Sequence, residues 1–433
     1  MESLPLQSFL QSLHKEQWQE VRLGEIVDVK HGYAFAGKNI TTEHTPNVLV
    51  TPGNFHIGGG FKSQKFKYFN GEIPKSFIFS TGDIIVTMTD LSKDGDTLGY
   101  SAKIPKDSEH IYLHNQRIGL LLFLRSDICK DFIYWLLRTK NYQAFIVNSA
   151  TGTSVKHTSP KLIGEYRFPL PPLTIQQKIA EILSSFDDKI DLLHRQNKTL
   201  ESLALTLFRH YFIDNPRNPK SVVGVGESLR GGGSDFAIQA PPSSHQKSGK
   251  WEMGKLGDYV RIELGGTPNT AKSEYWGGDI AWINSGEINK FRIVKPTKTI
   301  TKLGFEKSST KLLPKGSVVI AITGATLGQV SLLEIDSCAN QSVVGVIPND
   351  DFSSEFLYLW IKFNIDEIIL NQTGGAQQHI NKNDIANYHI IKPDKESLAS
   401  VNLKTYFEKI SHNTKQIQNL QAMRDMLFKA IFA

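Results

Sequence analysis

The chain has 433 residues, of which 49 are Lys or Arg and 43 Asp or Glu, for a formal net charge of +6. At ~100–200 residues per domain, this length predicts two or three domains. The longest apolar run, 118–124, is far shorter than the ~20 residues of a membrane span, and the first residues do not resemble a secretory signal. Only Cys129 and Cys338 are present, which excludes a disulfide framework and Cys-rich zinc modules, so we expect a cytoplasmic protein.

After an N-terminal segment of residues 1–17, the region 18–173 alternates short β-branched runs with Gly, Pro and Asn. The runs 83–88 and 118–124 are typical of strands, and 129–148 is typical of a helix. Pro171-Pro172 ends this region, and Thr174 and Gln177 offer a capping box for a long helix over 174–213. Its apolar positions recur at nearly the ~3.5-residue coiled-coil period, interrupted by Asn197. They are 175, 179, 182, 186, 190, 193, 200, 203, 207 and 211.

Residues 214–250 are rich in Gly, Pro and Ser, the composition of a flexible linker. The region 251–394 then repeats the earlier pattern, with strands expected at 318–322 and 343–347 and a helix at 353–371. A second long helix is expected within 395–433, interrupted by Thr414. Its apolar positions are 403, 407, 410, 417, 420, 423, 427 and 431.

The chain repeats itself in order, with offsets that drift from 234 to 220. Trp18, Leu23 and Gly24 recur as Trp251, Leu256 and Gly257, and Asn115-Gln116 recurs as Asn340-Gln341. His157 and Tyr166 recur as His379 and Tyr388, and the helix ends match through Leu207-Phe208 and Leu427-Phe428. A self-similar order of this kind indicates a tandem duplication. We call residues 18–213 the first copy and 251–433 the second copy.

The expected fold class is α+β, a pseudo-two-fold tandem duplication of a small α/β domain followed by a long helix. A long helix with a narrow apolar seam requires a partner helix, and each copy supplies one to the other. The two helices are therefore expected to pack as an antiparallel coiled coil, with one α/β domain at each end.

Catalytic motifs are absent from the sequence. There is no GxGxxG opening a helix, no phosphate loop ending in GK[ST], no GxSxG and no HExxH. The run from Thr323 to Gly328 is Gly-rich but lacks the lysine of a phosphate loop, so it predicts a tight turn. The histidines show no metal-ligand spacing, and the match of His157 with His379 favours a shared loop structure over a metal site.

Basic residues gather at matching places in the two copies. The stretch 61–69 interleaves Lys62, Lys65 and Lys67 with aromatic residues, and 290–315 carries eight basic residues, Arg292 among them, against the single acid Glu306. At an offset of 233, Lys62 aligns with Lys295 and Lys65 with Lys298, while Lys302 follows closely. Two equivalent basic faces are typical of proteins that contact duplex phosphates at two places.

Side chains that could read base edges are expected on loops. The second copy offers Asn284, Ser285, Thr323, Gln329, Gln377, Gln378 and His379. The first copy offers Lys30, His31, Tyr33, Lys156 and His157.

Three features of these residues together resemble a known family, the DNA-specificity subunits of type I restriction-modification systems. They are the segment 168–212, in which Pro169-Leu170-Pro171-Pro172 and Gln176-Gln177 enter the long helix, the run 322–330, and the recurrence of Trp251, Leu256, Gly257 and Asn340-Gln341. The resemblance covers nearly the whole chain. The second copy departs from it with Ile390-Ile391-Lys392-Pro393, so its helix is expected to start differently.

The resemblance implies two target-recognition domains, 18–173 and 251–394, each reading half of a split asymmetric DNA site. The helices 174–213 and 395–433 would separate them and dock two methyltransferase subunits, which restriction (translocase-nuclease) subunits would join. S-adenosylmethionine and ATP are then expected only in the partner subunits, and this chain is expected to be non-catalytic. Two alternatives stay open: the reading part of a fused modification enzyme, and a helix-mediated protein adaptor that does not bind DNA.

Overall fold

The computed structural model describes residues 9–10, 13, 15–90, 92, 94–152, 155–221, 249–370 and 379–432. These residues form two compact units. Unit 1 consists of residues 1–189 and 421–433, and unit 2 of residues 190–420. Within the described residues, no helix is long and apolar enough to cross a membrane.

Unit 1 is built around two four-stranded sheets, in the orders β2-β10-β6-β8 and β3-β5-β4-β9. Two-stranded pairs β1-β12 and β7-β11 complete its strands. The strands are β1 (Gln19–Arg22), β2 (Val27–His31), β3 (Ile40–Thr41), β4 (Asn47–Leu49), β5 (Lys67–Phe69), β6 (Ile84–Thr87), β7 (Thr89–Asp90), β8 (Ser101–Lys103), β9 (Ile111–Leu113), β10 (Ile118–Phe123), β11 (Lys156–His157) and β12 (Arg167–Leu170). The helices are α2 (Lys130–Leu136), α3 (Lys140–Ser149) and α4 (Pro160–Gly164).

Unit 2 repeats this arrangement with a five-stranded sheet, β14-β21-β18-β19-β16, a three-stranded sheet, β17-β15-β20, and the pair β13-β22. The strands are β13 (Glu252–Lys255), β14 (Arg261–Leu264), β15 (Trp276–Ile283), β16 (Arg292–Ile293), β17 (Lys298–Ile300), β18 (Val318–Ala321), β19 (Val330–Leu333), β20 (Cys338–Ala339), β21 (Val343–Ile347) and β22 (His389–Lys392). The helices are α6 (Leu256–Tyr259), α7 (Lys302–Glu306), α8 (Ser354–Leu370), α9 (Lys382–Asn387) and α10 (Lys395–Ser400).

The duplication is visible in equivalent backbone contacts. Leu23 N donates to Tyr166 O at 2.8 Å, and Leu256 N donates to Tyr388 O at the same distance. A Cβ on Gly32 would overlap the carbonyl oxygen of Asn115, and a Cβ on Gly265 would overlap that of Asn340. Glycine is therefore required at the same point of both copies, where the chain leaves the first strand of the sheet and meets the Asn-Gln turn.

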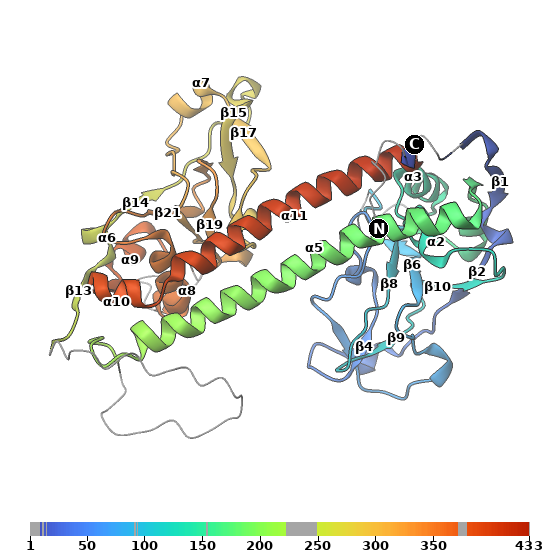
Figure 1. The fold of residues 1–433 in the computed structure, drawn as a ribbon, viewed down its shortest axis with the longest axis horizontal. Helices are drawn as coiled ribbons and strands as arrows, with labels where there is room; N and C mark the ends of the chain where they lie inside the picture. The colour runs from blue at the N-terminus through green and yellow to red at the C-terminus, as the bar shows by residue number, and fades with distance from the viewer. Residues whose placement is uncertain are drawn as a thin grey trace. The chain divides into compact units, whose positions relative to one another are not determined.

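The two long helices are α5 (Leu173–Phe208), which a π-helical turn extends over Arg209–Ile213, and α11 (Leu403–Phe432) (Figure 1). In unit 1, Ile179 and Leu183 of α5 share a core with Leu427 and Ile431 of α11. In unit 2, Ile190 and Leu193 pack with Ile417. Rising numbers in α5 meet falling numbers in α11, so the helices pack antiparallel, and the expected fold class is confirmed.

The polar interruptions of the two apolar seams face each other in unit 2. Asn197 Nδ2 donates to Thr414 Oγ1 at 3.3 Å, and Asn413 Nδ2 donates to Asn197 Oδ1 at 2.9 Å. Asn413 is completely buried, and its Oδ1 has no hydrogen-bond partner. This polar layer interrupts the apolar contacts between the two helices at a cost in stability.

Three local expectations were wrong. The helix expected over 129–148 is two helices, α2 and α3. The helical conformation is interrupted after Leu136, and the Thr139 hydroxyl caps the start of α3 by accepting from Tyr142 N. The capping box at Thr174 does not form, since α5 already begins at Leu173 and Pro172 O accepts from the amides of Ile175 and Gln176.

The third error concerns the last turns of α5. Position 203, expected in the seam, holds a leucine that is 40% exposed, whereas Ala204, Phe208 and Phe212 are completely buried. Those three residues pack with Phe356 and Trp360 of α8 in the core of unit 2. The end of α5 is therefore part of the core of unit 2, to which α11 contributes Leu403 and Phe407, and this core determines which face of α5 is buried.

Candidate nucleic-acid interface

The end of β2 and the loop after it combine a lysine with an exposed aromatic ring. Lys30 Nζ donates to Ser76 O at 2.7 Å and lies 4.9 Å from the centroid of the Phe77 ring. Tyr33 is 41% exposed, and its ring packs edge-on to Phe35. Tyr33 N donates to His114 O, and Tyr33 O accepts from Gln116 N, so the loop lies beside the Asn115-Gln116 turn. The exposed His31 ends β2 at this loop, so the structure brings Lys30, His31 and Tyr33 together.

The equivalent loop of the second copy has different chemistry. In the strand pairing, Lys30 opposes Leu120 and Glu263 opposes Gly345. Leu120 and Gly345 lie at the same distance in sequence after the equivalent Asn-Gln turns, so Lys30 and Glu263 occupy equivalent positions. Thr267 Oγ1 there donates to Gln341 Oε1 beside the second Asn-Gln turn. Equivalent strand positions thus carry a cation in the first copy and an anion in the second, where Glu263 forms ion pairs with Arg261 and Lys382.

The expected match between lysines is shifted by two residues. Lys67 begins β5 opposite Leu49 of β4, and Lys298 begins β17 opposite Trp282 of β15. β4 and β15 each have a parallel neighbour, β9 and β20, on the other side. Lys298 therefore corresponds to Lys67, not to Lys65. The sequence comparison missed this because the loop before the strand is two residues longer in the first copy.

The other predicted lysines are exposed or partly exposed: Lys62, Lys65 and Lys295 lie in loops, and Lys302 begins α7. Lys62 follows a capping-box turn over Pro52–Asn54, and its amide donates to Asn54 O at 2.7 Å. Lys65 has a φ of +53°, in the left-handed region that favours glycine. Lys295 is exposed just before β17, and Lys302 forms an exposed ion pair with Glu306.

Arg292 is not available to DNA, contrary to the expectation. It is 8% exposed, forms an ion pair with the equally buried Glu334, and donates through Nη2 to Phe407 O of α11 at 2.8 Å. Burial lowers the pKa of Arg292 to about 10. Its position inside a basic stretch gave no sign of burial, because the acid that pairs with it is 42 residues away. Arg292 fastens the sheet of unit 2 to α11.

The loop residues of the second copy divide into structural and accessible groups. Asn284 is occupied in a capping box, in which its Oδ1 accepts from Gly286 N and its amide groups donate to Glu287. Ser285 lies in that turn. Thr323 precedes the tight turn Gly324–Thr326, as the sequence indicated. Gln329 follows it, and its Oε1 is buried without a hydrogen-bond partner.

The matched histidines lie in equivalent loops. Lys156 and His157 form β11, and His157 Nδ1 is 3.2 Å from Thr89 Oγ1. The next residue of each copy makes the same bond: Thr158 N donates to Met88 O, and Ile380 N, after His379, donates to Ile322 O. This equivalence supports the shared loop structure. Gln377 and Gln378 lie outside the described residues.

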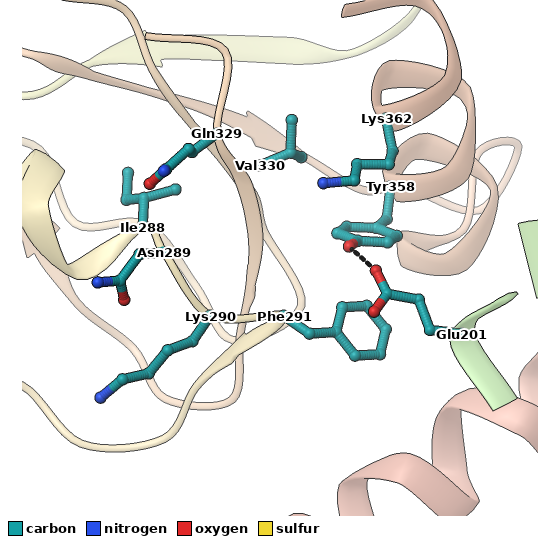
Figure 2. A pocket seen from close by; sticks show the side chains of 9 residues that line it. All are labelled: Glu201, Ile288, Asn289, Lys290, Phe291, Gln329, Val330, Tyr358 and Lys362. Atoms are coloured by element: carbon teal, nitrogen blue, oxygen red, sulfur yellow. Dashed lines mark hydrogen bonds between the residues drawn. The ribbon is translucent and has the colours of Figure 1, made fainter. Parts of the chain in front are cut away.

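Two of these loops meet at a pocket of about 260 Å³ in unit 2 (Figure 2). Residues 288–291 and 329–330 form one side, Tyr358 and Lys362 of α8 another, and Glu201 of α5 a third. Tyr358 OH donates to Glu201 Oε1 at 2.7 Å, and burial together with this carboxylate raises the pKa of Tyr358 well above its usual value. Sequence reasoning missed Lys362, Tyr358 and Glu201, although the i, i+4 spacing of Tyr358 and Lys362 places them on one helix face.

No group of three or more His, Cys, Asp or Glu side chains that could hold a metal ion occurs in the described part of the chain. The exposed side chains of Tyr33, Lys67 and Lys298 are of the types that contact base edges and phosphates.

Comparisons with known proteins agree with this pattern. The sequence model of the family described as "Type I restriction modification DNA specificity domain" matches residues 15–202 and 248–422. The chain is similar to the HindI specificity subunit of Haemophilus influenzae, with 25% identity over 77% of this chain and 85% of that protein. It is also 25% identical to the MjaIX specificity subunit of Methanocaldococcus jannaschii, over 71% of this chain and 69% of that one.

Among solved structures, the chain has the same fold as a type I restriction-modification S subunit from M. genitalium. The TM-score is 0.56 at 16% identity, with 96% of each chain covered. The two matched segments of the family model begin and end close to the two copies recognised in the sequence.

Proposed function

Because the chain belongs to the family of type I restriction-modification DNA-specificity subunits, we propose that each copy reads one half of a split, asymmetric DNA site. Sequence recognition of DNA is the role of this family of subunits, which work with methyltransferase and restriction subunits. The division of the site between the copies and the manner of assembly are our proposal.

The observation that carries this proposal is a shared framework with different loop chemistry. Gly32 and Gly265 meet the equivalent turns at Asn115 and Asn340, so the loops beside them occupy the same place in each copy. Yet Lys30 corresponds to Glu263, and Tyr33 corresponds to a glycine. Equivalent strand ends with opposite charge would favour different bases, since lysine donates to guanine acceptors and glutamate accepts from the cytosine amino group. Two different half-sites make an asymmetric site.

The long helices are proposed to dock the methyltransferase subunits. Each helix carries large apolar side chains that are exposed. On α5 these are Leu192 and Leu203, and on α11 they are Met423 and Met426, the last 60% exposed. Exposed apolar residues that neighbour each other on one helix face, as Met423 and Met426 do three residues apart, favour a protein interface.

We infer that this chain is the non-catalytic member of its complex. S-adenosylmethionine and ATP would be bound by partner subunits, two methyltransferase chains with restriction chains added to them. The work of the complex on DNA would place it in the cytoplasm.

The experiment that tests this proposal determines which DNA sequences become methylated. The chain is expressed with its methyltransferase partner in a host that lacks adenine methylation, and N6-methyladenine is mapped by long-read sequencing. A single split motif with two unlike halves is expected. A copurifying complex that methylates no specific sequence would contradict the proposal and would favour a protein adaptor, for which the exposed apolar residues of α5 and α11 would suffice.

A further inference from the structure

The pocket of Figure 2 contains an ammonium group that the proposed contacts leave unused. Lys362 extends from α8 toward the pocket, opposite the segment that carries Gln329, whereas the side chain of Lys290 runs outward along the rim. Within the described residues, neither lysine forms an ion pair. Lys362 is a partly buried residue, and an ammonium group without an ion pair at the mouth of a pocket favours an anionic ligand.

The single carboxylate of the pocket is already engaged. Glu201 accepts the hydroxyl hydrogen of Tyr358, and the charge of Arg292 acts on both Glu201 and Tyr358. Glu201 therefore repels an incoming anion less than an unpaired carboxylate would. The two lysines outnumber it, so the lining is left with a net positive charge.

Lys362 lines the same pocket as Gln329, which is a candidate for reading a base. Gln329 Oε1 is buried and has no donor, so no hydrogen bond holds the amide in its present rotamer. An unmade hydrogen bond of a buried acceptor is costly, and a rotation of the amide toward a base edge would relieve that cost. A base contact from Gln329 requires a backbone phosphate close by, because base edges and phosphates of one nucleotide are covalently linked.

We propose that Lys362 binds one phosphate of the DNA backbone at the mouth of this pocket, with Lys290 at its rim, and thereby holds the duplex for Gln329. The proposal rests on the proposed function, since it assigns a DNA contact to the second copy. An acidic side chain of a partner protein is the competing occupant. The loops 284–290 and 323–329 favour DNA, because both carry residues suited to base edges.

The test uses the complex with its methyltransferase subunits and duplexes that contain the methylated motif. Lys362→Met is expected to weaken binding about tenfold, evenly across related sequences, and to reduce the salt slope of log affinity by ~1. Lys362→Arg should retain most of the affinity. Lys255→Met is the matched control, an exposed lysine of unit 2 that does not line the pocket.

A set of duplexes, each with one neutral methylphosphonate, locates the contact. One position in the half-site read by the second copy should weaken binding to the unaltered complex but not to Lys362→Met. If both proteins show the same sensitivity at every position, the proposal is wrong. If Lys362→Met instead fails to copurify with the methyltransferase subunits while its thermal unfolding is unchanged, the pocket binds a protein. Failure of the unaltered complex to bind any specific duplex would contradict the proposed function itself.

Discussion

In unit 1 the ion pairs that connect the long helices with other elements share one acid, whereas in unit 2 a buried base contacts α11 and a separate tyrosine–glutamate hydrogen bond reaches α5. Asp187 of α5 accepts from Arg138, which follows α2, and from Arg424 of α11. In unit 2, Arg292 of β16 pairs with Glu334 and donates to α11, while Tyr358 of α8 donates to Glu201 of α5. Each unit thus ties its globular part to both helices, but the residues that do so are unrelated.

This difference shows what the duplication has preserved. The glycine-turn contacts are common to both copies, because backbone geometry leaves few substitutes there. The strand order β2-β10-β6-β8 also returns as β14-β21-β18-β19, to which unit 2 adds β16, the strand of Arg292. The polar ties differ because any buried donor and acceptor of suitable length can hold a helix against a sheet. The ties also differ in burial. The side chains of Arg292 and Glu334 are 6% exposed, while that of Asp187 is 25% exposed.

The largest loss of stability is expected for the most buried ion pair, Arg292–Glu334. Glu334→Ala leaves the Arg292 guanidinium buried without its counterion, which should cost roughly 3–5 kcal/mol of the free energy of unfolding. Urea unfolding measures it, with Glu306→Ala as the control, because the Lys302–Glu306 pair is exposed and should contribute less than ~0.5 kcal/mol. Equal losses of stability in the two variants would show that the buried Arg292–Glu334 ion pair contributes no more than an exposed one.

A smaller loss is expected in unit 1. Asp187→Asn removes the charge that two partly buried arginines share, and should cost roughly 1–3 kcal/mol. The control is Asp127→Asn, whose partner Arg125 is exposed. Thermal unfolding of the two variants compares them directly. A loss no larger than that of the control would mean that apolar packing alone holds α5 in place.

Asp107 in unit 1 predicts a pH-dependent stability. Burial raises the pKa of Asp107, but hydrogen bonds from Tyr112, the amide of Glu109 and His110 outweigh burial and lower it to about 2. A lowered folded-state pKa stabilises the fold above the ordinary value of 3.8, and this contribution disappears as the pH falls toward 2. Asp107→Asn should therefore be less stable by roughly 1–2 kcal/mol at neutral pH.

The gap between Asp107→Asn and the unaltered protein should narrow steadily between pH 4 and pH 2, as followed by urea unfolding at a series of pH values. A gap that stayed constant over this range would assign the loss to packing and not to the carboxylate charge.

The smallest effect is expected in the polar layer of the helix pair, and its sign is opposite. Replacing both Asn197 and Asn413 by Leu removes a buried acceptor that has no partner. The free energy of unfolding should therefore rise by ~1 kcal/mol, and thermal unfolding should show a higher midpoint. A destabilised double variant would show that the layer contributes more through its hydrogen bonds than it costs by burial.

The sequence predicted the duplication, the fold class and the two long helices, because order, hydrophobic period and glycine positions are local or periodic signals. It placed Ile190 and Leu193 correctly in the seam, but it failed at Leu203, where the core of unit 2 selects the buried face. The pairing of Arg292 with Glu334 and the approach of Lys362 to Gln329 depend on tertiary packing between distant segments. No periodicity in the chain encodes such contacts.

The central claim is that each copy reads its own half of the DNA site. The direct measurement is the methylome of a chimera in which residues 18–173 are exchanged for the matching segment of a relative with a different site. The account predicts that one half of the methylated motif changes, while the other half and the spacer stay the same. A motif that changed in both halves, or in neither, would contradict it.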